Sequence, residues 1–226
     1  MQFFRNSKVS LAAFVAFDLL LAYWLITLSQ ARNEVNTANA LNALGAIEYP
    51  DPFRLTPFQM SDQFGDLFSV EDFEGQWSLV FFGFTSCPDV CPTTMLELAQ
   101  AHRAIAETPD LPNPQVVFVS VDPERDSRLV VKQYVEQFNS DFTGLTGSEA
   151  QIEALASQLF VAFSKVDRAD IDFSKTGHES HRTDDYIVNH NTHLSLVNPE
   201  AELVALIRPP VRRESLVQAY SLLVSE

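Results

Sequence analysis

The stretch 79–92 constrains the fold of this chain more than any other part of its sequence. It opens with a short apolar run rich in phenylalanine, which is typical of a strand buried on both faces. The run ends in a turn that holds Cys87 and Cys91, and a helical pattern follows. This arrangement places both sulfurs at the rim of a sheet, beside a helix N-terminus, where partial positive charge favours thiolate over thiol. We therefore expect the chemistry of the protein in this loop.

Strand and helix signals alternate along the rest of residues 50–226, which predicts a layered α/β domain. The expected strands are 77–84, 115–121 and 160–166, with hairpins near 58–70 and over 193–207. The expected helices run from 92 or 94 to 106, from 126 or 127 to 138, from 148 to 160, and from 213 to 224. The predicted fold class is an α/β sandwich with an N-terminal hairpin.

The N-terminal segment has a different composition and predicts a membrane anchor. Residues 9–28 are mostly apolar and would span about 30 Å as a helix, enough to cross a bilayer. Arg5 and Lys8 precede the run, so residues 1–8 should be cytoplasmic and the domain should lie on the other side. Residues 29–49 are polar and predict a linker. A cleavable signal peptide is the alternative, although the run is longer than the usual h-region.

Asp18 lies near the middle of the predicted span. A carboxylate at that depth costs about 2.5–3.5 kcal/mol on insertion scales. Two interpretations stay open: the charge is tolerated among many apolar neighbours, or it makes a contact with a membrane partner.

Charge and cysteine content narrow the function classes. Residues 1–49 carry three basic and three acidic side chains, so residues 50–226 carry the whole formal net charge of −15. Such an acidic domain is a poor partner for nucleic acid, and a solvated surface or a basic protein partner fits it better. Two cysteines four residues apart close too small a loop to staple a fold. The pair is therefore expected to work chemically.

The residues from Phe82 to Pro92 resemble the Cys-x-x-x-Cys-Pro signature of the Sco/SenC family. The stretch 120–126 and the region around His190 fit the same family, with similar order and spacing. Members are membrane-anchored, thioredoxin-like copper proteins that help mature the binuclear copper A centre of cytochrome c oxidase. The resemblance implies a thioredoxin-like sandwich for residues 50–226, preceded by a single transmembrane helix.

The cysteines suit both a metal and a disulfide. On one helical turn the Cα atoms of Cys87 and Cys91 would lie about 6 Å apart, within reach of a disulfide. The same separation lets two thiolates bind one metal, and such soft ligands select Cu(I) or Zn. A neutral imidazole would complete a three-coordinate site that suits either oxidation state of copper.

Three of the five histidines are weak candidates for the third ligand. His102 lies on the helix after the cysteine loop and is expected at the surface. His178 and His181 lie in the polar segment 167–185, which predicts a solvated insertion, with a weak accessory metal site as the alternative.

His190 occupies the position that matches the family's ligand, nine residues before Pro199. His193 is an odd number of residues away, so on a regular strand it would face the other side. The sequence departs from the family at Asn189, where members often have aspartate. An aspartate there could orient the ring or raise its basicity, so the departure bears on metal affinity more than on metal identity.

The resemblance implies a copper metallochaperone for cytochrome c oxidase, with Cys87, Cys91 and His190 as ligands for Cu(I) or Cu(II). The expected partners are the copper-bearing oxidase subunit, a copper donor protein and the membrane. The expected location is the inner membrane, with the domain on the periplasmic or extracytoplasmic side. A metallochaperone of this kind is not expected to be an enzyme. The alternative is a thiol–disulfide reductase, with Cys87 and Cys91 as its redox pair. A thiol peroxidase is a further alternative.

Overall fold

The computed structural model describes residues 5–167 and 186–225, which fall into two units, Met1–Ala43 and Leu44–Glu226. The first unit contains helix α1 (Arg5–Ala43), which continues through the predicted span 9–28 into the predicted linker. Nothing between residues 5 and 43 is glycine or proline, so no helix breaker interrupts it. Within the part of the chain searched, which is limited to described residues, no helix is sufficiently long and apolar to cross a membrane. The predicted span is therefore not confirmed.

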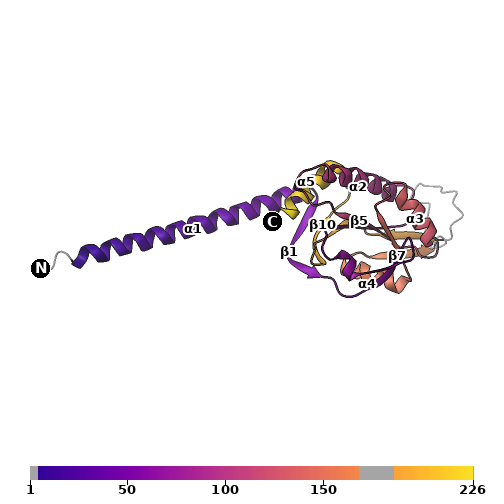
Figure 1. The fold of residues 1–226 in the computed structure, drawn as a ribbon, viewed down its shortest axis with the longest axis horizontal. Helices are drawn as coiled ribbons and strands as arrows, with labels where there is room; N and C mark the ends of the chain where they lie inside the picture. Colours follow the sequence, from indigo (N-terminus) through magenta and orange to yellow (C-terminus); the bar gives the residue numbers. More distant parts are fainter. Residues whose placement is uncertain (1–4, 168–185, 226) are drawn as a thin grey trace. The chain divides into compact units, whose positions relative to one another are not determined.

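The second unit is a layered α/β domain (Figure 1). Its strands are β1 (Ala46–Arg54), β2 (Gln59–Asp62), β3 (Leu67–Ser69), β4 (Ser78–Gly83), β5 (Gln115–Ser120), β6 (Thr143–Thr146), β7 (Phe163–Asp167), β8 (Tyr186–His190), β9 (Leu194–Val197) and β10 (Glu202–Ile207). Its helices are η1 (Val70–Phe73), α2 (Val90–Ala106), α3 (Arg128–Glu136), α4 (Glu149–Gln158) and α5 (Arg213–Val224).

Eight strands form one sheet in the order β1-β10-β9-β4-β5-β6-β2-β3, and β7 and β8 form a separate antiparallel pair. Strand β4 lies at the centre, parallel to β5 and antiparallel to β9. All six residues of β4 are buried, as the apolar run predicts. The parallel pairing brings the carboxyl ends of β4 and β5 to the same edge, where Gly83 is opposite Ser120.

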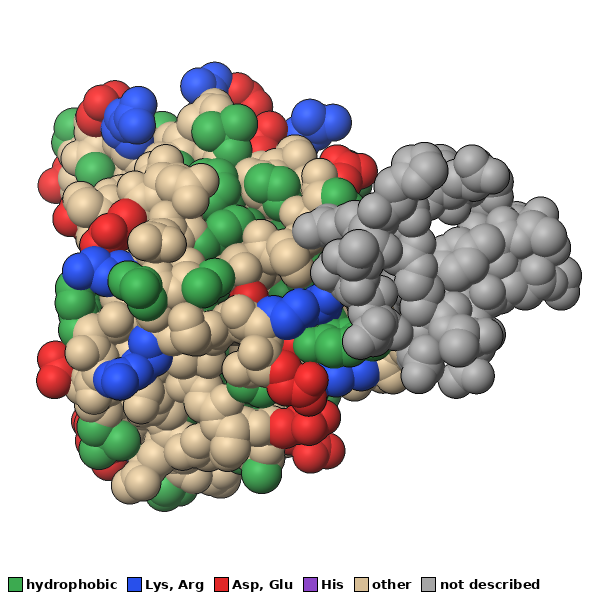
Figure 2. All heavy atoms as spheres, turned by 90° about the vertical axis from the view of Figure 1, so that its right-hand side faces the viewer, with side chains coloured by type: hydrophobic (Ala, Val, Ile, Leu, Met, Phe, Trp, Pro, Cys, Tyr) green, Lys and Arg blue, Asp and Glu red, His purple; other side chains and the backbone are tan. Residues whose placement is uncertain are grey.

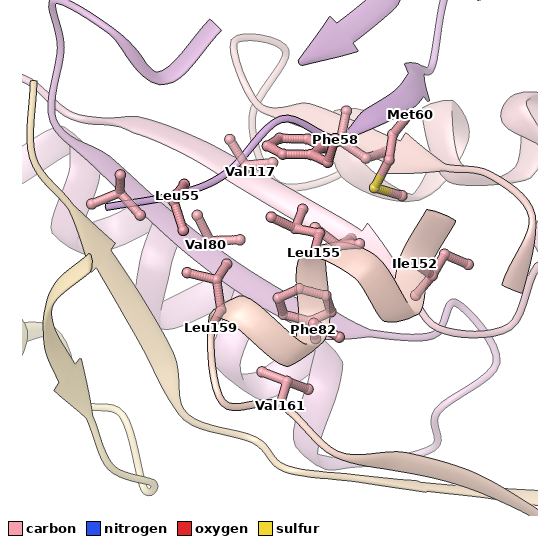
Figure 3. Packing of buried hydrophobic residues seen from close by; sticks show 14 of the residues in the cluster. Leu55, Phe58, Met60, Val80, Phe82, Val117, Ile152, Leu155, Leu159 and Val161 are labelled. Atoms are coloured by element: carbon pink, nitrogen blue, oxygen red, sulfur yellow. The ribbon is translucent and has the colours of Figure 1, made fainter. Parts of the chain in front are cut away.

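Helices cover both faces of this sheet. Helices α2 and α5 lie on one side and α4 on the other (Figure 1). Figure 3 shows the core under α4, where side chains of this helix and the adjoining turn point toward those of β4 and β5. These residues are Val80, Phe82, Val117, Ile152, Leu155, Leu159 and Val161. By alternation, the odd-numbered residues of β4 face α2.

Charged side chains do not form a uniformly acidic surface on the face drawn in Figure 2. Acidic, basic and apolar side chains are interspersed there, and acidic ones gather at the lower right of its described part. On this face the acidic side chains therefore lie among basic and apolar ones.

Most of the predicted elements are present. The hairpins β2–β3 and β9–β10 are antiparallel as expected. Ser127 caps α3, and Ser148 with Gln151 forms the predicted capping box of α4. Strands β1, β6 and β8 were not predicted. Apart from Asp167, which ends β7, the predicted insertion lies outside the described residues, and His178 and His181 lie there with it.

Candidate metal centre

The cysteine loop joins the carboxyl end of β4 to the first turn of α2. Helix α2 begins at Val90, earlier than predicted, so Thr94 lies inside the helix and does not cap it. The N-cap residue Asp89 makes no side-chain capping bond. Instead the Cys91 N–H donates to the Cys87 sulfur at 3.5 Å, the kind of contact that a capping oxygen ordinarily makes. Both sulfurs therefore lie at a helix N-terminus, as predicted, and both are free.

Gly83 allows Cys91 to pack directly against the sheet. A Cβ atom at Gly83 would lie 3.2 Å from the Cys91 sulfur and 2.9 Å from a ring carbon of Phe118. Cys91 is completely buried there, whereas Cys87 is half-buried. One sulfur is thus protected and the other is open to reaction.

The two thiols differ in pKa for a physical reason. The hydrogen bond from the Cys91 thiol lowers the pKa of Cys87 to about 5, helped by the backbone N–H groups of Asp89 and Cys91 and opposed by burial. The same hydrogen bond, together with burial, raises the pKa of Cys91 well above its ordinary value. At neutral pH the reduced pair is therefore a Cys87 thiolate beside a Cys91 thiol.

His190 is the histidine that the fold brings to this pair. It ends β8, and its Nε2 lies 3.8 Å from the Cys91 sulfur. Its Nδ1 lies 2.7 Å from the backbone oxygen of Asn191, so Nδ1 carries the donating proton and Nε2 keeps its lone pair. Burial lowers the pKa of His190, which favours the neutral ring. A neutral imidazole with a free Nε2 is the form that binds a metal.

The ring of His190 is oriented by a neighbour other than the one considered in the sequence. Asn189 is exposed, whereas Asn191 accepts the Nδ1 proton through its backbone oxygen. The Asn191 side chain in turn accepts the N–H of Ala162 at 2.9 Å. Orientation of the ring therefore does not need an aspartate at position 189.

The rings of two other histidines have other partners. His193 lies in the connection between β8 and β9, and its Nε2 lies 3.1 Å from the backbone oxygen of Leu159. His190 and His193 are thus separated by a strand end and do not alternate on one strand. The expectation of a surface position for His102 is wrong, because it is only 8% exposed. Its ring contacts Asn139 and packs edge-on against Phe142.

The loop between β5 and α3 contributes two buried carboxylates to which sequence reasoning gave no role. Asp126 accepts hydrogen bonds from the N–H and hydroxyl of Thr85, at 2.9 and 2.6 Å, and from Ser120 at 2.6 Å. Asp122 is fully buried and accepts hydrogen bonds from Arg125 and from Tyr186. Both lie in the stretch 120–126 that carried part of the family resemblance, which was the available signal.

The three predicted ligands are therefore neighbours: the Cys91 N–H contacts the Cys87 sulfur, and the Cys91 sulfur contacts the His190 Nε2. Among the described residues, no group of three or more His, Cys, Asp or Glu side chains is already close enough to hold a metal ion. The arrangement provides one thiolate, one thiol and one neutral imidazole. Such a set can bind a soft metal or exchange disulfides.

Comparison with known proteins identifies the family. A family model described as SCO1/SenC matches residues 50–225. The chain belongs to the SCO1/SenC family. Its domain accordingly has the mixed α/β, thioredoxin-like fold that was predicted, as in the crystal structure of copper-bound ScoI from Arabidopsis thaliana. That structure is 30% identical with a TM-score of 0.65, over 76% of this chain and 98% of that chain. Copper-bound yeast Sco1 is 26% identical with a TM-score of 0.66, over 77% and 90%.

Relatives known by sequence differ in how much of their length is matched. The mouse mitochondrial SCO2 homologue is 39% identical over 143 residues, which are 63% of this chain and 51% of the relative. A Stutzerimonas stutzeri protein named for copper binding is 31% identical over 199 residues, 88% of each chain. The chain thus spans about half the length of the mouse relative and most of the bacterial one.

Proposed function

We propose that this protein binds copper as a cargo and helps to assemble the copper A centre of cytochrome c oxidase. The observation that carries the proposal is the approach of the His190 Nε2 to the cysteine pair, 3.8 Å from Cys91. Copper-bound structures of relatives from Arabidopsis and yeast support it. The proposed ligands are Cys87, Cys91 and His190.

The separation of the two atoms fits a shared metal. Bonds of about 2.3 Å to sulfur and about 2.0 Å to nitrogen, set about 120° apart, place the two atoms about 3.7 Å from each other. Two sulfurs and an imidazole favour copper over hard ions. A three-coordinate ion keeps an open position, through which an acceptor protein can take the metal. Loading requires the loss of the Cys91 proton, because a thiolate is the ligand.

Retention of Cu(I) by the reduced full chain, in detergent, tests the proposal. We expect one Cu(I) per chain to be held against a competing chelator, and Cys87→Ser or Cys91→Ser to lose it. A wild-type protein that surrendered its copper as readily as either variant would contradict the proposal.

Thiol–disulfide exchange with the oxidase cysteines is the second candidate function. It is favoured by the asymmetry of the pair, since the half-buried Cys87 has a pKa of about 5 beside a buried thiol. In the proposed reaction the Cys87 thiolate attacks a substrate disulfide and releases one substrate thiolate. The Cys91 thiol then gives its proton to a released substrate thiolate, and its sulfur attacks Cys87, which releases the second substrate thiolate and leaves a Cys87–Cys91 disulfide. Both uses need the same sulfurs, so oxidised protein should not bind Cu(I).

We also propose that residues 9–28 anchor the protein in the inner membrane, with the domain on the extracytoplasmic side. The apolar run and its basic flank at Arg5 and Lys8 support this arrangement. The proposed partners are the copper-bearing oxidase subunit and a copper donor. The test is a reporter fused to the C-terminus, which should be active outside the cytoplasm. Reporter activity found only in the cytoplasm would contradict the orientation.

A further inference from the structure

His190 is carried by an element that is not part of the main sheet. The β7–β8 ribbon (Phe163–Asp167 and Tyr186–His190) forms a sheet of its own, and within the described residues its strands pair only with each other. Apart from the short chain connection from His190 to β9, the position of His190 relative to the cysteines therefore depends on contacts of side chains. Residues 186, 188 and 190 share one face of β8, and the middle one, Val188, lies in the hydrophobic core.

The other end of β8 is fixed by a hydrogen bond to a buried carboxylate. The Tyr186 hydroxyl donates to Asp122 at 2.7 Å, and Asp122 is fully buried. On the neighbouring strand, the ammonium group of Lys165 lies 2.8 Å from Glu124. Both acceptors lie in the loop after β5, so this loop holds the start of β8 while His190 lies at its far end.

The same loop also holds the cysteine side of the site. Asp126 fixes Thr85, two residues before Cys87, and the N–H of Val121 donates to the oxygen of Gly83 at 2.8 Å. A single loop thus connects the cysteine loop to the β7–β8 ribbon. Its two buried carboxylates each hold one half of the site.

Stacked side chains complete the connection between Tyr186 and His190. The guanidinium carbon of Arg125 lies 4.1 Å from the centre of the Tyr186 ring and 6.0 Å from that of Phe84. The Phe84 ring in turn meets the His190 ring edge-on, with centres 5.8 Å apart. A shift of Tyr186 would therefore move the His190 ring, both through the packed side chains of Arg125 and Phe84 and along the strand.

We propose that Tyr186 is a positioning residue, whose hydrogen bond to Asp122 sets the β7–β8 ribbon so that His190 is presented to the cysteines. This inference rests on the proposed copper function. Tyr186 lies four residues from His190 and acts on copper only through that ring. The bond matters most for Cu(II), because Cu(I) tolerates two thiolates alone.

The test is Tyr186→Phe in the full chain, which removes one hydroxyl and keeps the ring. We expect Cu(II) affinity to fall about tenfold, as for other changes to residues that orient a metal ligand. The Cu(II)–thiolate absorption should also change, and the affinity for Cu(I) should fall less. The matched control is Tyr220→Phe, which removes a hydroxyl bonded to the backbone oxygen of Pro112 at 2.8 Å. That bond lies at the opposite end of β5, so copper binding should be unchanged.

A double variant separates positioning from general loosening. In a protein that already carries His190→Ala, Tyr186→Phe should have no further effect on Cu(II) affinity, because the two changes act on the same ligand. An equal loss with and without His190→Ala would overturn the inference, as would wild-type binding in Tyr186→Phe.

A copper-free measurement keeps this inference distinct from the proposed function. In nuclear magnetic resonance spectra of the reduced apoprotein, Tyr186→Phe should shift or broaden the ring signals of His190 and leave those of His102 in place. Unchanged His190 signals would overturn the positioning role. If His190→Ala left Cu(II) binding intact, the proposed function would fail, and the ring signals would still decide the role of Tyr186.

Discussion

At the scale of single residues, the chemistry begins with the unequal environments of Cys87 and Cys91. The Cys91 thiol donates to the Cys87 sulfur, so the negative charge is held on the more exposed atom. A thiolate is both the nucleophile and the metal ligand. Cys87 is therefore ready for either use at neutral pH, whereas Cys91 must first lose its proton.

The pH dependence of alkylation tests this asymmetry. A lowered pKa means that the thiolate of Cys87 persists as the pH falls and is lost only below about 5. Iodoacetamide should thus modify Cys87 nearly as fast at about pH 6.5 as at about pH 8, and it should modify Cys91 slowly at both. Peptide mass spectrometry measures each rate. Cys91→Ala removes the main donor, so the inflection for Cys87 should move to higher pH; an unmoved inflection would contradict the assignment.

Gly83 provides a second test at this scale. In Gly83→Ala the new methyl group would overlap Phe118 and press on the Cys91 sulfur, so the free energy of unfolding should fall by about 1–3 kcal/mol. Gly144→Ala is the matched control, because its methyl group would overlap Val131 away from the cysteines. Denaturant titration should show a loss in both variants, but only Gly83→Ala should alter Cys91 labelling. Equal labelling in the two would argue against the close packing.

The site residues differ in how far the sequence could predict them. Cys87 and Cys91 follow from the strand, turn and helix pattern, and the family resemblance pointed to His190. His102 was misjudged because a helix periodicity does not show which other elements cover it, here Asn139 and Phe142. Tyr186 gives no local signal, since its role depends on a contact 64 residues away in sequence.

At the scale of elements, the loop between β5 and α3 is the part that joins the site together. Asp126 accepts three hydrogen bonds from Thr85 and Ser120, and these fix the start of the cysteine loop to the end of β5. The carboxylate is only 1% exposed, so the loss of one acceptor leaves a buried donor unpaired.

Replacing Asp126 with asparagine should therefore loosen this junction. An amide nitrogen cannot accept a hydrogen bond, so Asp126→Asn should lower the free energy of unfolding by about 1–3 kcal/mol and speed proteolysis within the cysteine loop. Asp110→Asn removes a charge from an exposed turn and is the control. Equal stability of the two variants in urea titrations would show that the Asp126 network does not hold the loop.

The strands that the sequence did not predict have identifiable reasons. Strand β1 contains Pro50 and Pro52, which are tolerated because it is an edge strand with an irregular register against β10. Strand β6 has only four residues, one of them glycine, and exists through its pairing with β5 and β2. The early start of α2 was missed because the Cys87 sulfur, an unusual cap, accepts the N–H of Cys91, the second residue of the helix.

At the scale of the whole molecule, the chain combines a helix with a folded domain, and the proposed copper site belongs to the domain. All three proposed ligands lie in the unit Leu44–Glu226, whereas Asp18 lies in the unit Met1–Ala43. The two units are expected to contribute separately to function.

Asp18→Leu tests this separation. The substitution should leave Cu(I) and Cu(II) affinities of the detergent-solubilised full chain within about twofold of wild type, because Asp18 and the proposed ligands belong to different units and independent sites do not couple. Any defect should appear only in oxidase assembly in cells. A changed copper affinity would show that the helix and the domain are coupled.

The measurement that tests the account most directly is a copper titration of two histidine variants. His190→Ala removes a proposed ligand, so Cu(II) affinity should fall by about 100-fold or more, because changes to residues that only orient a ligand already cost about 10- to 100-fold. The Cu(II)–thiolate absorption should largely disappear. Cu(I), held by two thiolates, should weaken less. His193→Ala is the matched control, because that ring bonds the oxygen of Leu159 instead, and its titration should match wild type. Loss of the absorption in His193→Ala, with retention in His190→Ala, would contradict the proposed site.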